Sequence, residues 1–380
     1  MGFASVARIN GTSRLHTHIP GTRCLNRGLP WPGPTHHLSL VSQKCSIEIH
    51  QMHKLARYRC RPHAGQKFIA QDQRFEFLGK IGDGAVGLVR KAQNLSNGAI
   101  VAVKVLAPDP KYIDPAAFND VEERFKREGS RGSRLRDDNL VDIIAYEENL
   151  NGISFDKARV KNPFIVMEYV KGRTLESLIK KLGSRRTEVV PIVTKQTLTI
   201  AHRIAKALEY LHEKKLVHRD VKPANVFLSS ITWDSVPSIV KLGDFGVTKW
   251  GDFLANAASG SLTVTLQQGL GTLKYMSPEQ AVRPKDVNVR SDMFSLGITL
   301  YELFTGQILQ SPHHVFEIMS ARTSRDSTIA KLYSLGVKCP YECAALFELI
   351  LDMFLASPKG RPSSTIVAGR FQYWLENVRE

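Results

Sequence analysis

The chain carries His218-Arg219-Asp220-Val221-Lys222-Pro223-Ala224-Asn225 and, 24 residues after Asp220, the tripeptide Asp244-Phe245-Gly246. Together these two segments supply a proton-accepting carboxylate, a lysine and two oxygen ligands of the kind that a hard divalent cation prefers. A three-residue match recurs by chance, whereas an eight-residue segment and a tripeptide in this order and spacing form a specific pattern. The pattern predicts a site that holds phosphate groups with the help of a metal ion.

A strand and a glycine-rich loop are predicted upstream of this site. Phe75, Phe77 and Ile81 fall on one face of a strand that leads into Gly82-Asp83-Gly84-Ala85-Val86-Gly87. Because Gly82, Gly84 and Gly87 have no side chains, the backbone of this loop can approach phosphate oxygens closely. A loop of this form can also open a dinucleotide-binding helix, so its meaning depends on whether a helix or a strand comes after it.

Two more strands come after the loop, and no helix lies between them. They are predicted at residues 88–92 and 100–105, with Asn97-Gly98 as a two-residue hairpin turn. Lys104 lies inside the second of these apolar strands, where an unpaired ammonium group would be costly. The sequence therefore predicts anionic partners for Lys104.

A helix is predicted over residues 120–136, and it carries three acids that could pair with Lys104. Glu128 is the best candidate, and Glu122 and Glu123 are its competitors because spacing alone does not separate them. Gly132 lies one turn after Glu128. Since glycine lowers helix stability by about 1 kcal/mol relative to alanine and offers no side chain for packing, we expect this helix to be loosely held.

These elements, in this order, resemble the protein kinase superfamily over about residues 75–375. Further segments carry the resemblance: the apolar strand 164–170, the helix 197–213, Gly271-Thr272-Leu273-Lys274-Tyr275-Met276-Ser277-Pro278-Glu279, Arg290-Ser291-Asp292-Met293-Phe294-Ser295-Leu296-Gly297 and Lys359-Gly360-Arg361-Pro362. The sequences of these motifs are most similar to those of the bacterial eukaryotic-like Ser/Thr kinases. Such relatives commonly carry a transmembrane helix and an outer sensor domain after the kinase domain, and we expect neither here.

The resemblance implies ATP and Mg²⁺ as cofactors, with Mn²⁺ as an alternative metal. It implies that Asp220 accepts or orients the proton of the acceptor hydroxyl, that Lys222 neutralises the γ-phosphate, and that Lys104 paired with Glu128 positions the phosphates. Asn225 and Asp244 would be the metal ligands. Lysine two residues after the aspartate is characteristic of Ser/Thr kinases, so protein serine and threonine hydroxyls are the expected acceptors.

The resemblance also assigns the nucleotide pocket and three structural residues. The residues expected around ATP are Ile81, Gly82, Gly84, Gly87, Val89, Ala102, Lys104, Met167, Glu168, Val170 and Phe227. Met167 would close the back of the adenine pocket, and the backbone of Glu168 and Val170 would face the adenine edge. Glu279 is expected to pair with Arg361, and Asp292 is expected to anchor the catalytic loop.

Regulation is expected in the segment between Asp244 and Glu279. Arg219 precedes the catalytic aspartate, and kinases with arginine there commonly bind a phosphorylated activation segment. Thr263 and Thr265 are the expected phosphorylation sites, although Ser259 and Ser261 also lie in this segment. Thr272 would sit in the acceptor groove beside Asp220 and Lys222. A back-to-back or activation homodimer is an open expectation.

Charge separates the first 70 residues from the rest. They hold ten Lys or Arg residues against a single acid, and thus +9 of the net charge of +16. Four interpretations stay open for this basic arm: a disordered tail without strong function, an arm for anionic surfaces or nucleic acid, an organelle transit peptide, and a true start at Met52. The basic residues are scattered without aromatic stacking partners, which disfavours nucleic acid as a partner.

The five cysteines form no pair of C-x-x-C motifs, which disfavours a disulfide framework or a structural zinc site and favours the cytoplasm. The predicted fold is α+β: a bilobal protein kinase fold with a β-rich N-lobe that has one main helix (71–170) and a mostly helical C-lobe (171–380), after the arm 1–70. A pseudokinase scaffold and a small-molecule kinase of the same fold are the two competing hypotheses. The presence of Lys104, Asp220, Asn225 and Asp244 argues against the scaffold.

Overall fold

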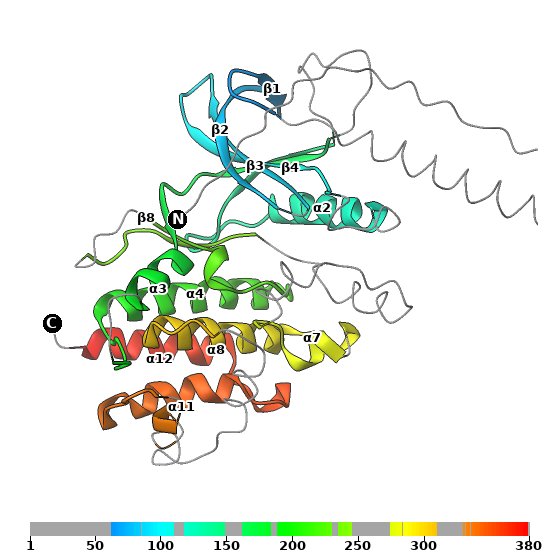
Figure 1. The fold of residues 1–380 in the computed structure, drawn as a ribbon. Helices are drawn as coiled ribbons and strands as arrows, with labels where there is room; N and C mark the ends of the chain where they lie inside the picture. Colours follow the sequence, from blue (N-terminus) through cyan, green and yellow to red (C-terminus); the bar gives the residue numbers. More distant parts are fainter. Residues whose placement is uncertain are drawn as a thin grey trace, which may run out of the picture. The chain divides into compact units, whose positions relative to one another are not determined.

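A computed structural model describes residues 62–84, 86–109, 118–148, 162–183, 188–229, 235–244, 274–282, 284–309, 330, 332–334 and 336–378. All of them belong to one folded unit, which spans His50–Glu380. Among the described residues, its N-terminal part is a β-sheet with one helix, and its C-terminal part is mostly helical (Figure 1).

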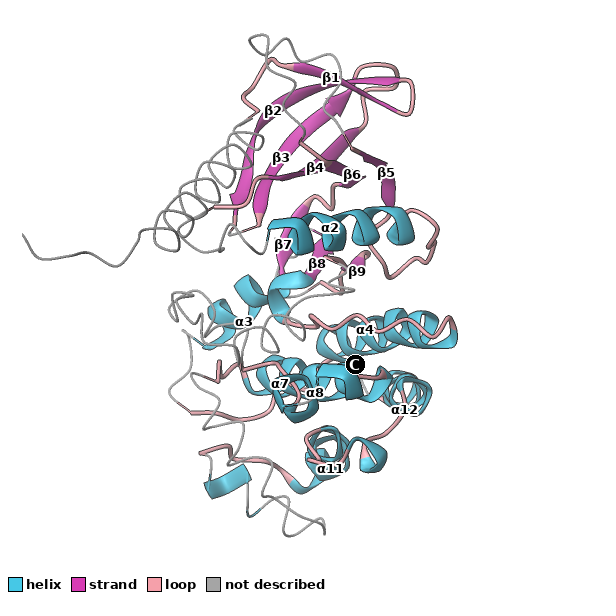
Figure 2. Cartoon of the chain, turned by 90° about the vertical axis from the view of Figure 1, so that its right-hand side faces the viewer, coloured by secondary structure: helices cyan, strands magenta, loops and turns pink. Residues whose placement is uncertain are grey.

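The N-terminal part is a six-stranded antiparallel sheet with the strand order β1-β2-β3-β4-β6-β5 (Figure 2). Its strands are β1 (Lys67–Ala70), β2 (Gln73–Asp83), β3 (Gly87–Asn94), β4 (Ile100–Leu106), β5 (Ile143–Glu147) and β6 (Phe164–Glu168). Chain-adjacent strands pair from β1 to β4, as their alternating apolar residues and short loops predict. β6 then inserts between β4 and β5.

The sheet begins earlier than the sequence suggested. β1 lies inside the segment 1–70 that composition assigned to the arm, and its Phe68 is buried. The Phe68 ring stacks on Phe75 and Phe77, with ring centroids 5.1 and 4.5 Å apart. These aromatic contacts bury large apolar area on one face of the sheet, and they explain why β1 is part of the domain.

Two details of β2 and β3 differ from the sequence-based expectations. Ile81 is 45% exposed, whereas Phe75 and Phe77 are buried, because register shifts on either side of Gly79 to Lys80 interrupt the alternation along β2. The loop between β3 and β4 covers residues 95–99 and is longer than the predicted two-residue turn. The Asn97 side chain accepts a hydrogen bond from Ala99 N within it, and Gly98 has φ 74°.

The helix α2 (Phe118–Gly132) packs against β5 (Figure 2). It begins two residues before the predicted start and ends four residues before the predicted end. The chain leaves the helix in a turn, in which Leu135 N donates to the carbonyl of Gly132. Glu128 therefore lies in the last turns of α2, and Phe125 and Gly129 are buried beside it.

The C-terminal part holds a small antiparallel sheet of β7 (Gly172–Thr174), β8 (Val226–Ser229) and β9 (Val240–Leu242). Its α-helices are α3 (Leu175–Gly183), α4 (Lys195–Glu213), α7 (Pro278–Val282), α8 (Val289–Thr305), α11 (Ala344–Met353) and α12 (Ser364–Asn377). Short 3₁₀ turns occur at η2 (Pro223–Asn225), η3 (Pro284–Asp286), η4 (Tyr341–Cys343) and η5 (Pro358–Gly360). None of the helices within the described ranges has the length and apolar character needed to span a membrane.

α8 is the central helix of this part, and α3, α4 and α11 all contact it (Figure 1). Every residue from Ser291 to Thr305 is buried, as expected of a helix that carries apolar residues on every side. Asn288 caps its start through a reciprocal pair of hydrogen bonds with Ser291. The cap fixes the first turn of α8, and that turn carries Asp292.

Candidate active site

Lys104 of β4 contacts two carboxylates that come from distant parts of the sequence. Its Nζ lies 2.7 Å from Glu128 Oε1 on α2, and it also donates to Asp244 Oδ1 after β9. Glu128 is buried, whereas Glu123 is exposed and Glu122 is half-buried. Among the three helical acids, Glu128 is thus the one that the structure joins to Lys104.

The segment after α4 brings two polar side chains together around Asp220. Lys222 Nζ lies 3.0 Å from Asp220 Oδ1, and Asn225 Nδ2 lies 3.0 Å from Asp220 Oδ2. Asn225 Nδ2 also donates to the Asp220 carbonyl at 2.8 Å. Asp220 and Asn225 are both 5% exposed, so these hydrogen bonds hold the carboxylate in one orientation within a largely buried setting.

The two candidate metal ligands lie on adjoining backbone segments. Asn225 ends η2 just before β8, and its carbonyl accepts a hydrogen bond from Gly243 N, the residue before Asp244. Because Asn225 Nδ2 is engaged by Asp220, its side-chain oxygen is the atom suited to a metal. An amide oxygen and a carboxylate are oxygen donors, and they fit Mg²⁺ or Mn²⁺.

Asp292 at the start of α8 holds the backbone of His218 and Arg219. Its Oδ2 accepts the His218 N–H at 2.8 Å, and its Oδ1 accepts the Arg219 N–H at 2.7 Å. Gln280 Nε2 donates to the Arg219 carbonyl at 3.1 Å. Arg219 has φ 65° and Asp244 has φ 59°, so both candidate-site residues adopt left-handed backbone conformations that non-glycine residues rarely use.

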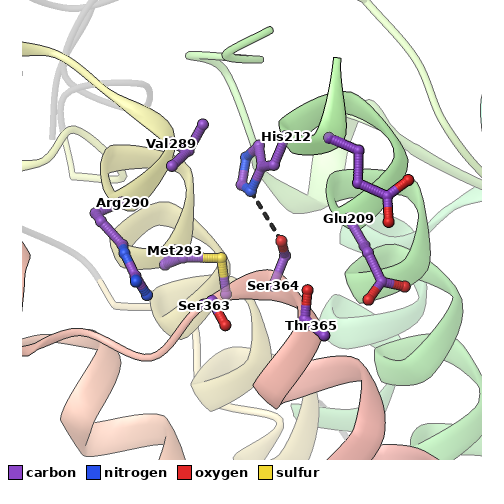
Figure 3. Close-up of a pocket in the computed structure, with 9 residues that line it drawn as sticks. Glu209, His212, Val289, Arg290, Met293, Ser363, Ser364 and Thr365 are labelled. Carbon is purple, nitrogen blue, oxygen red and sulfur yellow. Dashed lines mark hydrogen bonds between the residues drawn. The ribbon is translucent and has the colours of Figure 1, made fainter. Parts of the chain in front are cut away.

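A second contact reaches Asp292 from α4. His212 Nε2 lies 2.9 Å from Asp292 Oδ2, and His212 Nδ1 lies 3.0 Å from Ser364 Oγ at the start of α12 (Figure 3). The His212 ring borders a pocket between α4, α8 and α12 that Arg290 and Met293 also line. Asp292 thus links the candidate site to three helices.

Glu279 and Arg361 form a buried ion pair, although 82 positions separate them in the sequence. Arg361 Nη1 and Nη2 donate to the two Glu279 oxygens at 2.7 and 2.9 Å, and Ser291 Oγ donates to Glu279 at 2.6 Å. Burial alone would raise the pKa of Glu279, but these hydrogen bonds outweigh it and hold the pKa below its ordinary value. The bidentate geometry fixes α7 against the η5 turn.

Backbone pairing places part of the expected nucleotide pocket. Met167 on β6 pairs with Ala102 on β4, and Val89 on β3 pairs with Lys104. The Phe227 ring on β8 lies so close to Gly243 that an added Cβ there would meet it at 3.0 Å. Phe227 is therefore next to the residue that precedes Asp244.

The three glycines of the loop have different surroundings: Gly82 and Gly84 face open space, and Gly87 lies against another strand. An added Cβ at Gly82 would meet nothing within 4 Å, and one at Gly84 would meet only the Gly87 carbonyl at 3.8 Å. An added Cβ at Gly87 would lie 2.2 Å from the Val105 carbonyl oxygen. Glycine at 87 is thus required by the close approach of β3 and β4, whereas the side of the loop at Gly82 and Gly84 is open.

Burial lowers the pKa of His218 below its ordinary value of 6.5, although the nearby Asp292, Asp220 and Asp244 carboxylates act in the opposite direction. Its Nδ1 accepts the Asp220 N–H at 3.3 Å, and its Nε2 faces the Gly243 carbonyl at 3.2 Å. These contacts fit a neutral ring with the proton on Nε2. A neutral His218 connects the segment of Asp220 to the segment of Asp244.

Several expected residues lie outside the described residues. These are Phe245 and Gly246, the hydroxyl residues Ser259, Ser261, Thr263 and Thr265, and the groove residue Thr272. Their expected roles stay predictions.

The protein kinase domain family matches residues 75–370. The chain belongs to the protein kinase family. It is 34% identical over 237 residues to a probable serine/threonine-protein kinase PknB of Bifidobacterium longum (62% of this chain, 30% of the relative). It is 32% identical over 283 residues to the serine/threonine-protein kinase PrkC of Bacillus subtilis (74% and 38%). The chain spans about a third of the length of these relatives, and their names confirm the resemblance to bacterial-type Ser/Thr kinases.

The fold agrees with solved kinase domains. The crystal structure of the Mycobacterium tuberculosis PknI kinase domain matches with a TM-score of 0.56 at 22% identity, over 84% of this chain and 100% of that one. The predicted bilobal α+β kinase fold is therefore confirmed.

Sequence reasoning missed two residues that hold this kinase site. Gln280 binds the Arg219 carbonyl, and its Oε1 accepts the Ser277 N–H at 3.0 Å. Its position directly after the Ser-Pro-Glu tripeptide was the available signal. His212 gave no such signal, because a single histidine in an amphipathic helix resembles any other core residue.

The expectation that the helix is loosely held at Gly132 was wrong. Gly132 is buried, and an added Cβ there would lie 2.3 Å from Ile143 Cδ1. The side chain that glycine lacks is thus replaced by one from the neighbouring strand, and α2 packs closely where a loose contact was expected.

Proposed function

We propose that this chain transfers the γ-phosphoryl group of ATP to serine and threonine hydroxyls of proteins. The observation that carries the proposal is the cluster in which Lys222 and Asn225 hold the buried Asp220 carboxylate, at 3.0 Å each. Asp220 orients the acceptor hydroxyl and takes its proton as the hydroxyl oxygen bonds to the γ-phosphorus. The bond from that phosphorus to the bridging oxygen breaks, and ADP leaves.

Two lysines stabilise the charge that moves in this step. Lys222 faces the transferred group from the side of Asp220, and Lys104 faces the phosphates of the nucleotide. Glu128 fixes the Lys104 ammonium group through a 2.7 Å contact between side chains that are about 10% exposed. A charge that is held in place before the reaction needs no reorganisation when the transition state forms.

Asn225 and Asp244 are the residues that would hold Mg²⁺, or Mn²⁺ in its place. When bound, the metal ion neutralises charge on the phosphate oxygens. The Asp244 contact with Lys104 places that carboxylate on the side of the phosphate-facing lysine. Asp244 would then hold the metal ion with the same carboxylate that contacts Lys104.

The remaining roles belong to the same proposal. Val89, Ala102 and Phe227 cover the adenine, Met167 closes the back of its pocket, and Val170 and Glu168 meet its edge through their backbone. The Glu168 N–H donates to the Asp142 carbonyl at 2.9 Å, so the Glu168 carbonyl is the group left for adenine. Ile81, exposed on β2, is available to the nucleotide.

Serine and threonine are favoured as acceptors by Lys222 and by the names of the relatives, which are serine/threonine-protein kinases. Proteins are the proposed substrates, and a second copy of the chain is one of them if the activation segment is phosphorylated in trans. That reaction requires at least a transient homodimer. The use of ATP and the free thiols of Cys339 and Cys343 support the cytoplasm as the compartment.

The experiment is phosphoryl transfer from radiolabelled ATP to the chain itself and to a serine/threonine peptide library, with Asp220→Asn as the comparison. The variant should keep its fold and its ATP affinity while the rate falls by about 100-fold or more. A turnover within about threefold of wild type would contradict the role of Asp220. Wild-type protein that binds ATP without any transfer would indicate a pseudokinase scaffold, and transfer to small molecules alone would indicate the other competing class.

A further inference from the structure

The helix that carries Glu128 touches the sheet through glycines. Phe125, Gly129 and Gly132 follow one another at helical spacing on α2, and all three are buried. An added Cβ at Gly129 would lie 2.4 Å from Tyr146 Cδ2, and one at Gly132 would lie 2.3 Å from Ile143 Cδ1. Both partners belong to β5, so the two glycines allow α2 to lie closer to this strand than any side chain would permit.

The strand that α2 touches is in register with the residues of the proposed active site. Tyr146 pairs with Ile165 on β6, and Ile165 pairs with Lys104 on β4. Two residues further along β6, Met167 pairs with Ile143. Because directly paired residues of antiparallel strands place their side chains on the same face, Tyr146 and Lys104 both point toward the face that α2 covers.

A small displacement of α2 away from β5 would lengthen the contact between Glu128 and Lys104. Cβ atoms ordinarily approach other heavy atoms to 3.4–4 Å, so a methyl group at Gly132 would displace, by about 1 Å, either the end of the buried Ile143 side chain or α2 itself. Glu128 lies one turn before Gly132, and its oxygen is 2.7 Å from Lys104 Nζ. A shift of about 1 Å would stretch this contact beyond the range in which a hydrogen bond keeps its strength.

We propose that Gly132 is a positioning residue: its lack of a side chain sets the separation of α2 from β5 and thereby holds Glu128 at bonding distance from Lys104. Ile143 is its complement, since its Cδ1 fills the space that a side chain at 132 would take. This inference rests on the proposed function for its kinetic consequence. The geometry also predicts an effect on nucleotide affinity, which does not depend on turnover.

The test exchanges one methyl group between helix and strand. Gly132→Ala adds a methyl group to α2, and Ile143→Val removes the Cδ1 atom that it would strike. After the exchange the nearest remaining contacts are those to Ile143 Cγ1 and Cβ, at 3.3 and 3.7 Å. Gly369→Ala is the matched control, because it adds the same group to α12 at a position where a Cβ meets nothing within 4 Å.

We expect Gly132→Ala to lower kcat/KM and to weaken ATP affinity, measured by fluorescence titration, each by about tenfold, the effect of losing one charge-assisted hydrogen bond. The double variant should recover to within about threefold of Ile143→Val in both quantities, because the packed volume is conserved. Gly369→Ala should match wild type, or melt at a slightly higher temperature because alanine favours helix.

Wild-type kinetics and affinity in Gly132→Ala would overturn the proposal. A double variant as impaired as Gly132→Ala, or one that does not fold, would also overturn it, since the exchange should restore the packing. If the wild-type protein binds ATP without transferring phosphate, the proposed function fails. The affinity series then still decides whether Gly132 positions Glu128.

Discussion

Asp292 Oδ1 accepts the backbone N–H of Arg219 at 2.7 Å while Arg219 holds a φ of 65°. A left-handed conformation costs a non-glycine residue about 1–3 kcal/mol, and a hydrogen bond to a buried charge contributes about 1.5–3 kcal/mol. The two quantities are of similar size, so the carboxylate offsets the strain of the backbone immediately before Asp220. The second oxygen of Asp292 adds the bonds to His218 N and His212.

Asp292→Asn should therefore destabilise the protein. An amide has one acceptor oxygen in place of two, so at least one of the three donors would face an NH₂ group inside the core. We expect the free energy of unfolding to fall by about 2–3 kcal/mol, measured by urea denaturation. Asp72→Asn is the control, because Asp72 is exposed and its φ of 61° suits asparagine. The control should change stability by less than about 0.5 kcal/mol, and an equally small change in Asp292→Asn would contradict the anchoring role.

Glu128→Gln and Glu123→Gln form a matched pair on one helix. Both variants keep the shape and packing of the side chain and remove its charge, but only Glu128 contacts Lys104. Loss of a charge-assisted hydrogen bond of about 1.5–3 kcal/mol corresponds to a loss of about 10- to 100-fold in kcat/KM for Glu128→Gln. Steady-state kinetics should leave Glu123→Gln near wild type. Equal losses in the two variants would show that helix charge matters and that the specific pair does not.

The sequence could name candidate site residues where the proposed function requires a particular chemical group. Asp220, Lys222, Asn225 and Asp244 could be named because phosphate handling needs those side chains at those spacings. Pairs of structural residues could be named where the resemblance to the family assigns them, as with Glu279 and Arg361. The same information favoured Glu128 over Glu122 and Glu123 only by resemblance, because three helical acids look alike until the helix is placed against the sheet.

Packing between distant elements was not predictable from the sequence. Gly132 was judged by helix propensity, which predicts a weak helix, but Ile143 lies eleven positions further along and fills its space. Phe68 was assigned to a basic arm by composition, although its contacts with Phe75 and Phe77 decide its position. In both cases a tertiary contact outweighed a local tendency, and no local pattern reports such contacts.

The activation segment gives a prediction that rests on the sequence and on Arg219. Phosphate accepts bidentate, charge-assisted hydrogen bonds from guanidinium, so phosphorylation of Thr263 and Thr265 would give this segment a partner beside Asp220. We expect phosphatase-treated protein to show a kinetic lag that preincubation with ATP removes. Thr263→Ala/Thr265→Ala should lose most activity and keep ATP binding.

Ser259→Ala/Ser261→Ala is the matched control for the threonine pair, because it removes two hydroxyl groups from the same segment. This control should retain the lag and its removal by ATP. Mass spectrometry of the fully active enzyme is the second measurement. Absence of phosphate from both threonines in that sample would refute the mechanism and leave the kinase assignment unaffected.

His218 gives the last prediction, which concerns pH. Burial holds the pKa of the folded-state ring below the ordinary value of 6.5, so the folded protein binds fewer protons here than the unfolded chain does below that pH. The contribution of a neutral His218 to stability is thus complete above about pH 6.5, and it declines as the pH falls from there toward the folded-state pKa. One such group changes the unfolding free energy by up to about 1.4 kcal/mol per pH unit.

His218→Phe cannot titrate, so its stability should fall less steeply than that of wild type between about pH 6.5 and 5.5 in urea denaturation series. Parallel slopes in the two proteins would show that His218 takes up its proton without cost in the folded state.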